Sequence, residues 1–162
     1  MASTIVSSTL KVIVEEKIKL NGAEQGSRNV LSISDVNEIY KRIITCPGTD
    51  TRIVDFHSSV SDAVLTPLDV QDVKYMRVTN LDNANSVVLS LQMDVGEDDT
   101  AADSTTSIKL GAGESFMMGT PHDGVNTSDS SIVVITDLID LECLMVSPQG
   151  NNVDIESFVA ST

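Results

Sequence analysis

The amino-acid sequence predicts an all-β protein, an antiparallel sandwich of about nine short strands with little helix. Hydrophobic and polar residues alternate with a period of two along much of the chain, which is typical of strands with one buried face. Turn residues interrupt this alternation about every 8 to 12 residues, and no long amphipathic helix pattern separates the runs. A chain of 162 residues is long enough to bury a core without a metal ion or a disulfide.

The N-terminal part of the chain predicts two strands joined by a tight turn. The first predicted strand covers residues 10–20, in which apolar side chains alternate with other residues. Asn21-Gly22 follows, and both residues tolerate the positive φ angles that a two-residue turn requires. The chain resumes as an apolar run at residues 29–33, so we expect this second strand to pair with the end of the first.

The segment 34–44 allows two interpretations. A short helix that begins at Ser34 would place its apolar residues on one face. The same residues also continue into a strand over 39–46 that ends at a turn, 47–50. We favour the strand because the next run, 51–56, then completes a local hairpin. The apolar residues concerned are Val36, Ile39, Tyr40 and Ile43.

The centre of the predicted fold is the pair of runs 73–79 and 87–93, which are rich in strand-forming residues. In the second run, alternate residues share one face, and residues 58–72 read as a connection across the end of the sheets. Further strands are expected at residues 107–110, 114–118, 132–138, 139–146 and 153–160.

The domain organisation follows from what the sequence lacks. No internal repeat or low-complexity linker divides the chain, so we expect a single β-sandwich domain over residues 9–162. Residues 1–8 precede the first predicted strand and are interpreted as an N-terminal arm. Residues 1–10 contain neither a basic start nor a continuous apolar stretch, so we expect a soluble protein made in a cytoplasm.

The charge of the chain excludes two classes of partner. The 24 acidic residues outnumber the 10 basic ones, which gives a formal charge of -14 and a pI near 4.2. Nucleic acids and anionic membranes are both bound through Lys and Arg, so we expect neither as a partner. The last basic residue is Lys109, and the uniformly acidic C-terminal third suits head-to-tail subunit contacts. Ordinary surface lysines without a partner are the alternative.

Cys46 and Cys143 are the two cysteines of the chain, and each lies beside apolar residues. Because no export signal is present, we expect buried reduced thiols rather than a disulfide. Neither thiol is at metal-ligand spacing from His57 or His122.

The first candidate for a metal site is an acidic loop that follows the run 87–93. Clustered carboxylates suit calcium, which prefers about 6 to 8 oxygen ligands. Their spacing fits no EF-hand loop, so we favour a solvated polar loop and expect no resident metal and no cofactor. The carboxylates concerned are Asp94, Glu97, Asp98, Asp99 and Asp103.

A second candidate is a metal-binding trio of His57, His122 and Glu114. The segment 110–116 resembles the strand-turn-strand at the mouth of a cupin, but the paired histidines of that family are missing here. The chain also lacks a Gly-x-Ser-x-Gly elbow and a glycine-rich phosphate loop. Only 3% of its residues are aromatic, which leaves little for a sugar-binding platform. We therefore expect no enzymatic activity.

Four segments resemble small virion structural proteins of tailed bacteriophages, especially marine and cyanobacterial phages. They occur in the expected order and together span most of the chain. The segments are 18–22 (IKLNG), 73–82 (VKYMRVTNLD), 110–116 (LGAGESF) and 153–160 (VDIESFVA).

The resemblance implies a jelly-roll-like β-sandwich without catalytic residues. We expect a capsid decoration (cement) protein, a homo-oligomer with a trimer as the first guess, that bridges subunits of the major capsid protein. Its location would be the virion, assembled in the host cytoplasm. The N-terminal arm would dock on a neighbouring subunit through Ile5 and Val6. The alternatives are a phage tail adaptor or fibre component, and a calcium- or sugar-binding module.

Overall fold

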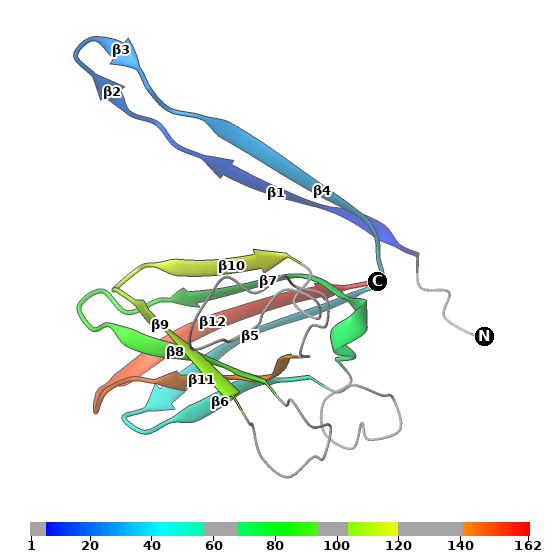
Figure 1. The fold of residues 1–162 in the computed structure, drawn as a ribbon, viewed down its shortest axis with the longest axis vertical. Helices are drawn as coiled ribbons and strands as arrows, with labels where there is room; N and C mark the ends of the chain where they lie inside the picture. Colours follow the sequence, from blue (N-terminus) through cyan, green and yellow to red (C-terminus); the bar gives the residue numbers. More distant parts are fainter. Residues whose placement is uncertain (1–5, 57–67, 94–103, 120–140) are drawn as a thin grey trace. The chain divides into compact units, whose positions relative to one another are not determined.

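The structure is a computed structural model that describes residues 6–56, 68–93, 104–119 and 141–162 (Figure 1). The chain divides into two compact units. We call Met1–Glu38, with Thr162, the hairpin unit, and Ile39–Ser161 the body. Among the described residues, strands β1 to β4 pair with one another. The single domain over residues 9–162 stays a prediction.

The hairpin unit is a long antiparallel ribbon. Strand β1 (Ser8–Glu15) pairs with β4 (Arg28–Val36), and the short β2 (Lys19–Leu20) pairs with β3 (Ala23–Glu24). The turn between β2 and β3 is Asn21-Gly22, with φ angles of 51° and 82°. Positive φ at both positions is what a type I′ hairpin turn requires, so the predicted turn is confirmed.

The body consists of two antiparallel four-stranded sheets. One has the strand order β10-β7-β12-β5 and the other β6-β11-β8-β9 (Figure 1). A short 3-10 turn, Val70–Asp72, precedes β7. The strands are β5 (Glu38–Pro47), β6 (Thr51–Asp55), β7 (Val73–Asn80), β8 (Val87–Met93), β9 (Ser104–Leu110), β10 (Ser115–Gly119), β11 (Leu141–Ser147) and β12 (Asn152–Ser161).

The strand pairs of the body are nested. Strand β8 pairs with β9, and around them lie the pairs β7–β10, β6–β11 and β5–β12. A ribbon of nested pairs rolled into two sheets is the jelly-roll arrangement. The predicted fold class, an all-β antiparallel sandwich of jelly-roll type, is therefore confirmed.

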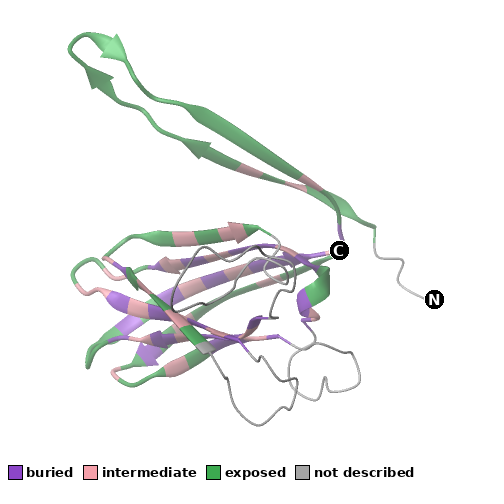
Figure 2. Ribbon diagram, viewed as in Figure 1, coloured by how far each residue is buried: buried purple, intermediate pink, exposed green. Residues whose placement is uncertain are grey.

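The core lies between the two body sheets and is almost entirely aliphatic (Figure 2). Strand β8 shows why: its alternate residues are buried and the intervening ones are half-buried. The predicted face of this strand is thus confirmed. Its core residues are Val87, Leu89, Leu91 and Met93.

The ambiguous segment 34–44 is resolved as strand, because β5 begins at Glu38. The expected local hairpin between β5 and β6 is wrong, since the two strands belong to different sheets. The turn between them pairs instead with the turn before β12: Gly48 N donates to Asn151 O (2.9 Å) and Gly150 N to Gly48 O (3.2 Å). The predicted strand at 132–138 lies outside the described residues.

Candidate interaction surfaces

The hairpin of β1 and β4 has one apolar face. Residues directly opposite each other in an antiparallel pair share a face, and Leu10 lies opposite Ile33, and Val12 opposite Leu31. Val14 extends the same face toward the turn. We call these five side chains the apolar face of the hairpin.

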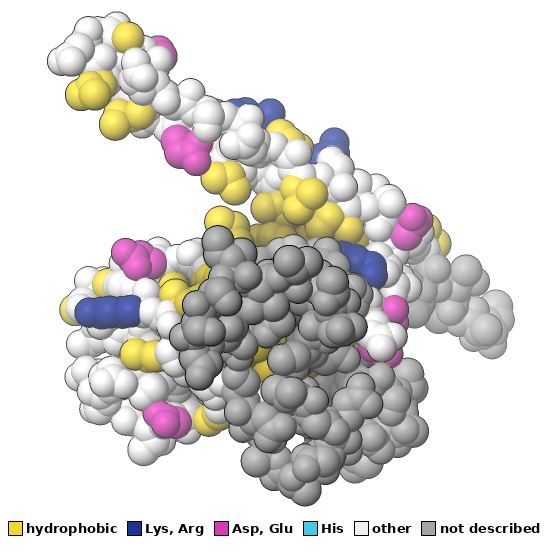
Figure 3. Space-filling model, viewed as in Figure 1, with side chains coloured by type: hydrophobic (Ala, Val, Ile, Leu, Met, Phe, Trp, Pro, Cys, Tyr) yellow, Lys and Arg dark blue, Asp and Glu magenta, His cyan; other side chains and the backbone are white. Residues whose placement is uncertain are grey.

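The other side of the hairpin is mixed, with basic, acidic and apolar residues. A two-stranded ribbon has no second layer of its own to cover an apolar face. Leu31 on the apolar face is 48% exposed, and Val14 is 37% exposed. Figure 3 shows hydrophobic side chains along the surface of the hairpin. The pairs on the mixed side are Lys11–Ser32, Ile13–Val30 and Glu15–Arg28.

The body sheet β10-β7-β12-β5 also carries apolar residues on the face turned away from the core. In β5, Tyr40 and Ile44 pack against the core, so alternation places Ile39 and Ile43 on the other face. Their exposed fractions are 56% and 62%, and Met117 of β10 is 45% exposed. We call this surface the outer face of the body.

Two aromatic rings lie on the same outer face. Tyr75 and Phe158 make an edge-to-face contact, with ring centroids 6.1 Å apart. Burial raises the pKa of the Tyr75 hydroxyl above its usual value, and the nearby Arg77 only partly opposes this effect. The outer face therefore contains a packed aromatic pair as well as charged side chains.

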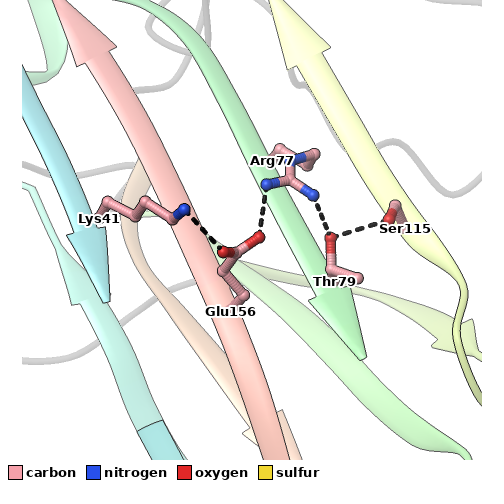
Figure 4. A network of polar contacts seen from close by, with 5 residues as sticks. All are labelled: Lys41, Arg77, Thr79, Ser115 and Glu156. Atoms are coloured by element: carbon pink, nitrogen blue, oxygen red, sulfur yellow. Dashed lines mark hydrogen bonds and ion pairs between the residues drawn. The ribbon is translucent and has the colours of Figure 1, made fainter. Parts of the chain in front are cut away.

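A chain of polar contacts crosses all four strands of the outer face (Figure 4). Glu156 of β12 lies between two cations, with Oε1 3.2 Å from Lys41 Nζ and Oε2 2.5 Å from an Arg77 Nη atom. Arg77 also donates to Thr79 Oγ1 (2.8 Å), which lies 2.8 Å from Ser115 Oγ. The charges of this face are thus paired with one another.

The pKa of Glu156 reflects this pairing. Burial raises the pKa of the carboxyl, but hydrogen bonds from Lys41 and Arg77 outweigh that effect, so the pKa lies below its usual value of 4.5. Glu156 is therefore ionised at neutral pH and holds β5, β12 and β7 in register on this face.

The turns at one end of the body are held by buried backbone contacts. Asn80 is fully buried, and its Nδ2 donates to Asn85 O (2.8 Å) and Gly111 O (3.0 Å). Its Oδ1 accepts from Asp82 N (3.0 Å). One side chain thus ties the β7–β8 connection to the β9–β10 turn.

A shallow cavity of about 440 Å³ opens beside these turns. Both of its carboxylates are engaged within the chain: Asp154 Oδ1 accepts from Thr45 Oγ1 (2.6 Å), and Asp82 Oδ1 accepts from Asn85 N and Ala84 N. The hydrogen bond from Asn85 N, followed by the one from Ala84 N, lowers the pKa of Asp82 below its usual range. The lining residues are Thr45, Leu81, Asp82, Asn83, Asn152 and Asp154.

The sequence-predicted metal candidates fall mostly outside the described residues. Of the described ones, Glu114 accepts a hydrogen bond from Gly111 N (2.6 Å) and closes its own turn. In the part of the chain that the structure describes, no three His, Cys, Asp or Glu residues are grouped to hold a metal ion. The residues outside the described ranges are Asp94, Glu97, Asp98, Asp99, Asp103, His57 and His122.

The two cysteines are free and buried, as the sequence predicts. Burial raises the pKa of the Cys143 thiol to about 11, and it also raises the pKa of Cys46. Cys143 Sγ lies 3.1 Å from Gln92 Oε1. Both groups are therefore protonated thiols at neutral pH, unsuited to nucleophilic chemistry.

The structure describes one of the two predicted interface residues of the N-terminal arm. Ile5 lies outside the described residues, whereas Val6 is 83% exposed. The apolar faces of the hairpin and the body were not proposed as interfaces from the sequence. A signal was present in β1, where Leu10, Val12 and Val14 alternate with other residues, but the partner strand that completes this face had to be seen.

In the described residues, no helix has the length and apolar character needed to cross a membrane. No protein-family model matches the chain, and no curated protein sequence matches it. One solved structure is similar, a Bacillus chain from the work titled "Bacillus endospore appendages form a novel family of disulfide-linked pili". It is 12% identical with a TM-score of 0.39, and the similarity covers 100% of this chain and 97% of that chain.

Proposed function

We propose that this chain is a non-enzymatic structural subunit of a bacteriophage virion. In this role it is a capsid decoration protein that bridges subunits of the major capsid protein. It acts as a homo-oligomer, assembled in the host cytoplasm, and uses neither nucleic acid nor a membrane as partner.

The observation that carries the proposal is the apolar face of the hairpin. Apolar patches exposed on a soluble protein mark contacts with other proteins. Here the patch lies on a two-stranded ribbon, while the body is a sandwich in which Asn80 and the Glu156 network are hydrogen-bonded within the chain. Such a division suits a protein whose work is to make contacts rather than to turn over a substrate.

The resemblance to phage virion proteins adds support from separate positions. The segment 73–82 covers β7 and the start of its following turn, 110–116 covers the β9–β10 turn, and 153–160 lies in β12. These parts form the frame of the body. They carry the fold and the bonded turns, and none of them supplies a catalytic group.

The test is binding to phage heads. The purified protein is mixed with expanded heads that lack it, the heads are sedimented, and the temperature at which they release their contents is measured. We expect the protein to sediment with the heads and to raise that temperature. The same assay with purified tails should leave the protein in the supernatant.

Two results would overturn the decoration role. Binding to tails and not to heads would make the protein a tail adaptor or fibre component. Binding to neither, together with a rise in melting temperature when calcium is added, would favour a calcium-binding module.

A further inference from the structure

Among the residues that the structure describes, each unit carries one sheet face with exposed apolar side chains. In the hairpin unit this surface is the apolar face of β1 and β4, where Leu31 is 48% exposed and the other side chains range from half-buried to exposed. In the body it is the outer face of sheet β10-β7-β12-β5, where Ile43 is 62% and Met117 is 45% exposed. Both are faces of antiparallel sheets, and two such faces pack together as layers about 10 Å apart.

We propose that the hairpin of one copy packs its apolar face on the outer face of the body of a second copy. The contact rests on the assembly role proposed above and names its first partner, a second copy of this chain. The contact joins two different surfaces and is therefore heterologous, so it leads to a ring if the rotation closes and to an open filament if it does not.

Charge favours this pairing over a contact between two bodies. Residues 1–38 contain four basic and five acidic residues, a net charge of -1, which leaves -13 of the total -14 for residues 39–162. Two bodies would repel each other as whole units, because each carries a large net negative charge, although the charges of the outer face itself are paired. A hairpin approaches the same body with almost no net charge, so the apolar contact is opposed far less.

The polar groups of the outer face are compatible with being covered. Glu156 is already paired with Lys41 and Arg77, and Arg77 also donates to Thr79. A hairpin placed over this face would therefore leave no charged group of this network without a partner, which is the main cost of covering charges.

The dimensions of the two surfaces also agree. Strand β1 has 8 residues and β5 has 10. At roughly 3.4 Å per residue these are about 27 Å and about 34 Å long, so the strand that carries half of the apolar face is no longer than the strand it would lie along.

The test uses one substitution on each surface and a matched control. Leu31→Asp places a charge on the apolar face of the hairpin, and Ile43→Asp places one on the outer face of the body. Val30→Asp is the control, because Val30 is adjacent to Leu31, equally exposed at 48%, and on the mixed side of the hairpin. Assembly is measured by native mass spectrometry and sedimentation velocity, and folding by circular dichroism.

We expect wild type and Val30→Asp to form oligomers, and Leu31→Asp and Ile43→Asp each to be monomeric. An equimolar mixture of the two monomeric variants should then form a 1:1 dimer. The first supplies an intact outer face and the second an intact hairpin, so one complete contact is restored. One variant is labelled with nitrogen-15, since the two substitutions give chains of equal mass.

Three results would overturn the proposal. A mixture that stays monomeric would mean that the hairpin packs within its own chain. An Ile43→Asp variant that still assembles would mean that hairpins pack on each other, and a monomeric wild type would mean that no second copy is bound. Val14→Asp and Met117→Asp repeat the test should either first variant fail to fold.

The head-binding assay separates this contact from the decoration role. A restored dimer that does not bind heads would support the contact between copies and contradict the decoration role. A wild-type monomer that binds heads would do the reverse.

Discussion

The buried side chain of Asn80 holds two connections of the body together. Its amide reaches the carbonyls of Asn85 and Gly111 and accepts from the amide of Asp82, so three backbone groups from two connections meet on one buried side chain. Buried polar groups that lose their partner are costly, because water cannot replace the lost hydrogen bond.

We expect Asn80→Ala to lower the free energy of unfolding by about 3 kcal/mol. Urea denaturation followed by circular dichroism would measure it. Asn83→Ala is the matched control, because Asn83 is exposed in the same connection and should change stability by less than about 0.5 kcal/mol. Equal losses in the two variants would show that burial of Asn80 is not the cause.

Glu156 gives a prediction about pH. Its pKa is lowered in the folded state, so its contribution to stability is present above the usual value of 4.5 and is lost as pH falls below it. At pH 7 we expect the free energy of unfolding of Glu156→Gln to be about 1–2 kcal/mol lower than that of wild type. The difference should shrink steadily below pH 4.5 in urea titrations.

Glu38→Gln is the control for Glu156, since Glu38 is exposed on the neighbouring strand β5. The free energy of unfolding of this variant should stay close to that of wild type at pH 7 and at pH 3. A Glu156→Gln deficit that persisted unchanged at pH 3 would attribute the effect to packing rather than to the ionised carboxylate.

At the scale of elements, Gly26 marks a tight point in the hairpin. A Cβ atom at Gly26 would collide with the carbonyl of Glu16, beside the point where Glu16 N donates a hydrogen bond to Ser27 O. We expect Gly26→Ala to destabilise the hairpin by about 1–3 kcal/mol. Hydrogen exchange should show lost amide protection in β1 and β4 and unchanged protection in β7 and β12.

Ser27→Ala serves as the comparison for Gly26→Ala. It removes an exposed hydrogen bond to Glu16 and adds no atoms, so the protection of the hairpin should fall only slightly. Loss of protection throughout the body in Gly26→Ala would contradict the separate strand pairing of the two units.

Local patterns predicted elements well wherever neighbouring residues decide the structure. Asn21-Gly22 allows positive φ at both positions, and β8 alternates without interruption, so the first turn and one core strand were predictable. The placement of β5 and β6 was not. A turn at 47–50 serves a hairpin or a change of sheet equally, and the deciding hydrogen bonds of Gly48 come from Asn151, far along the chain.

The interaction surfaces were less predictable than the strands. The apolar alternation of β1 is visible in the sequence, but the face exists only because the register sets Leu31 beside Val12. The outer face needs β5, β7, β10 and β12 to meet, and no local signal specifies that order. The sequence directed attention to Ile5 and Val6, which precede β1, and their role as interface residues stays a prediction.

At the scale of the whole molecule, the concentration of charge in the body predicts how assembly responds to salt. Raising sodium chloride from 0.05 M to 0.5 M shortens the screening distance from about 14 Å to about 4 Å. Repulsion between copies should weaken while the apolar contact persists, so we expect the dissociation constant to fall several-fold. Sedimentation at the two concentrations measures it, and weaker assembly in salt would indicate attraction between charges instead.

The nested strand order also bears on synthesis of the chain. Strand β12 leaves a ribosome after every other strand that the structure describes, yet it is the strand that joins β7 to β5. Contacts between distant parts of a chain form slowly, whereas β1 and β4 are close in sequence and can pair early. A nascent chain therefore carries a finished hairpin while its body is still open. Two growing chains on one messenger would each have a hairpin but no completed outer face to receive one, so their association would wait until β12 is in place.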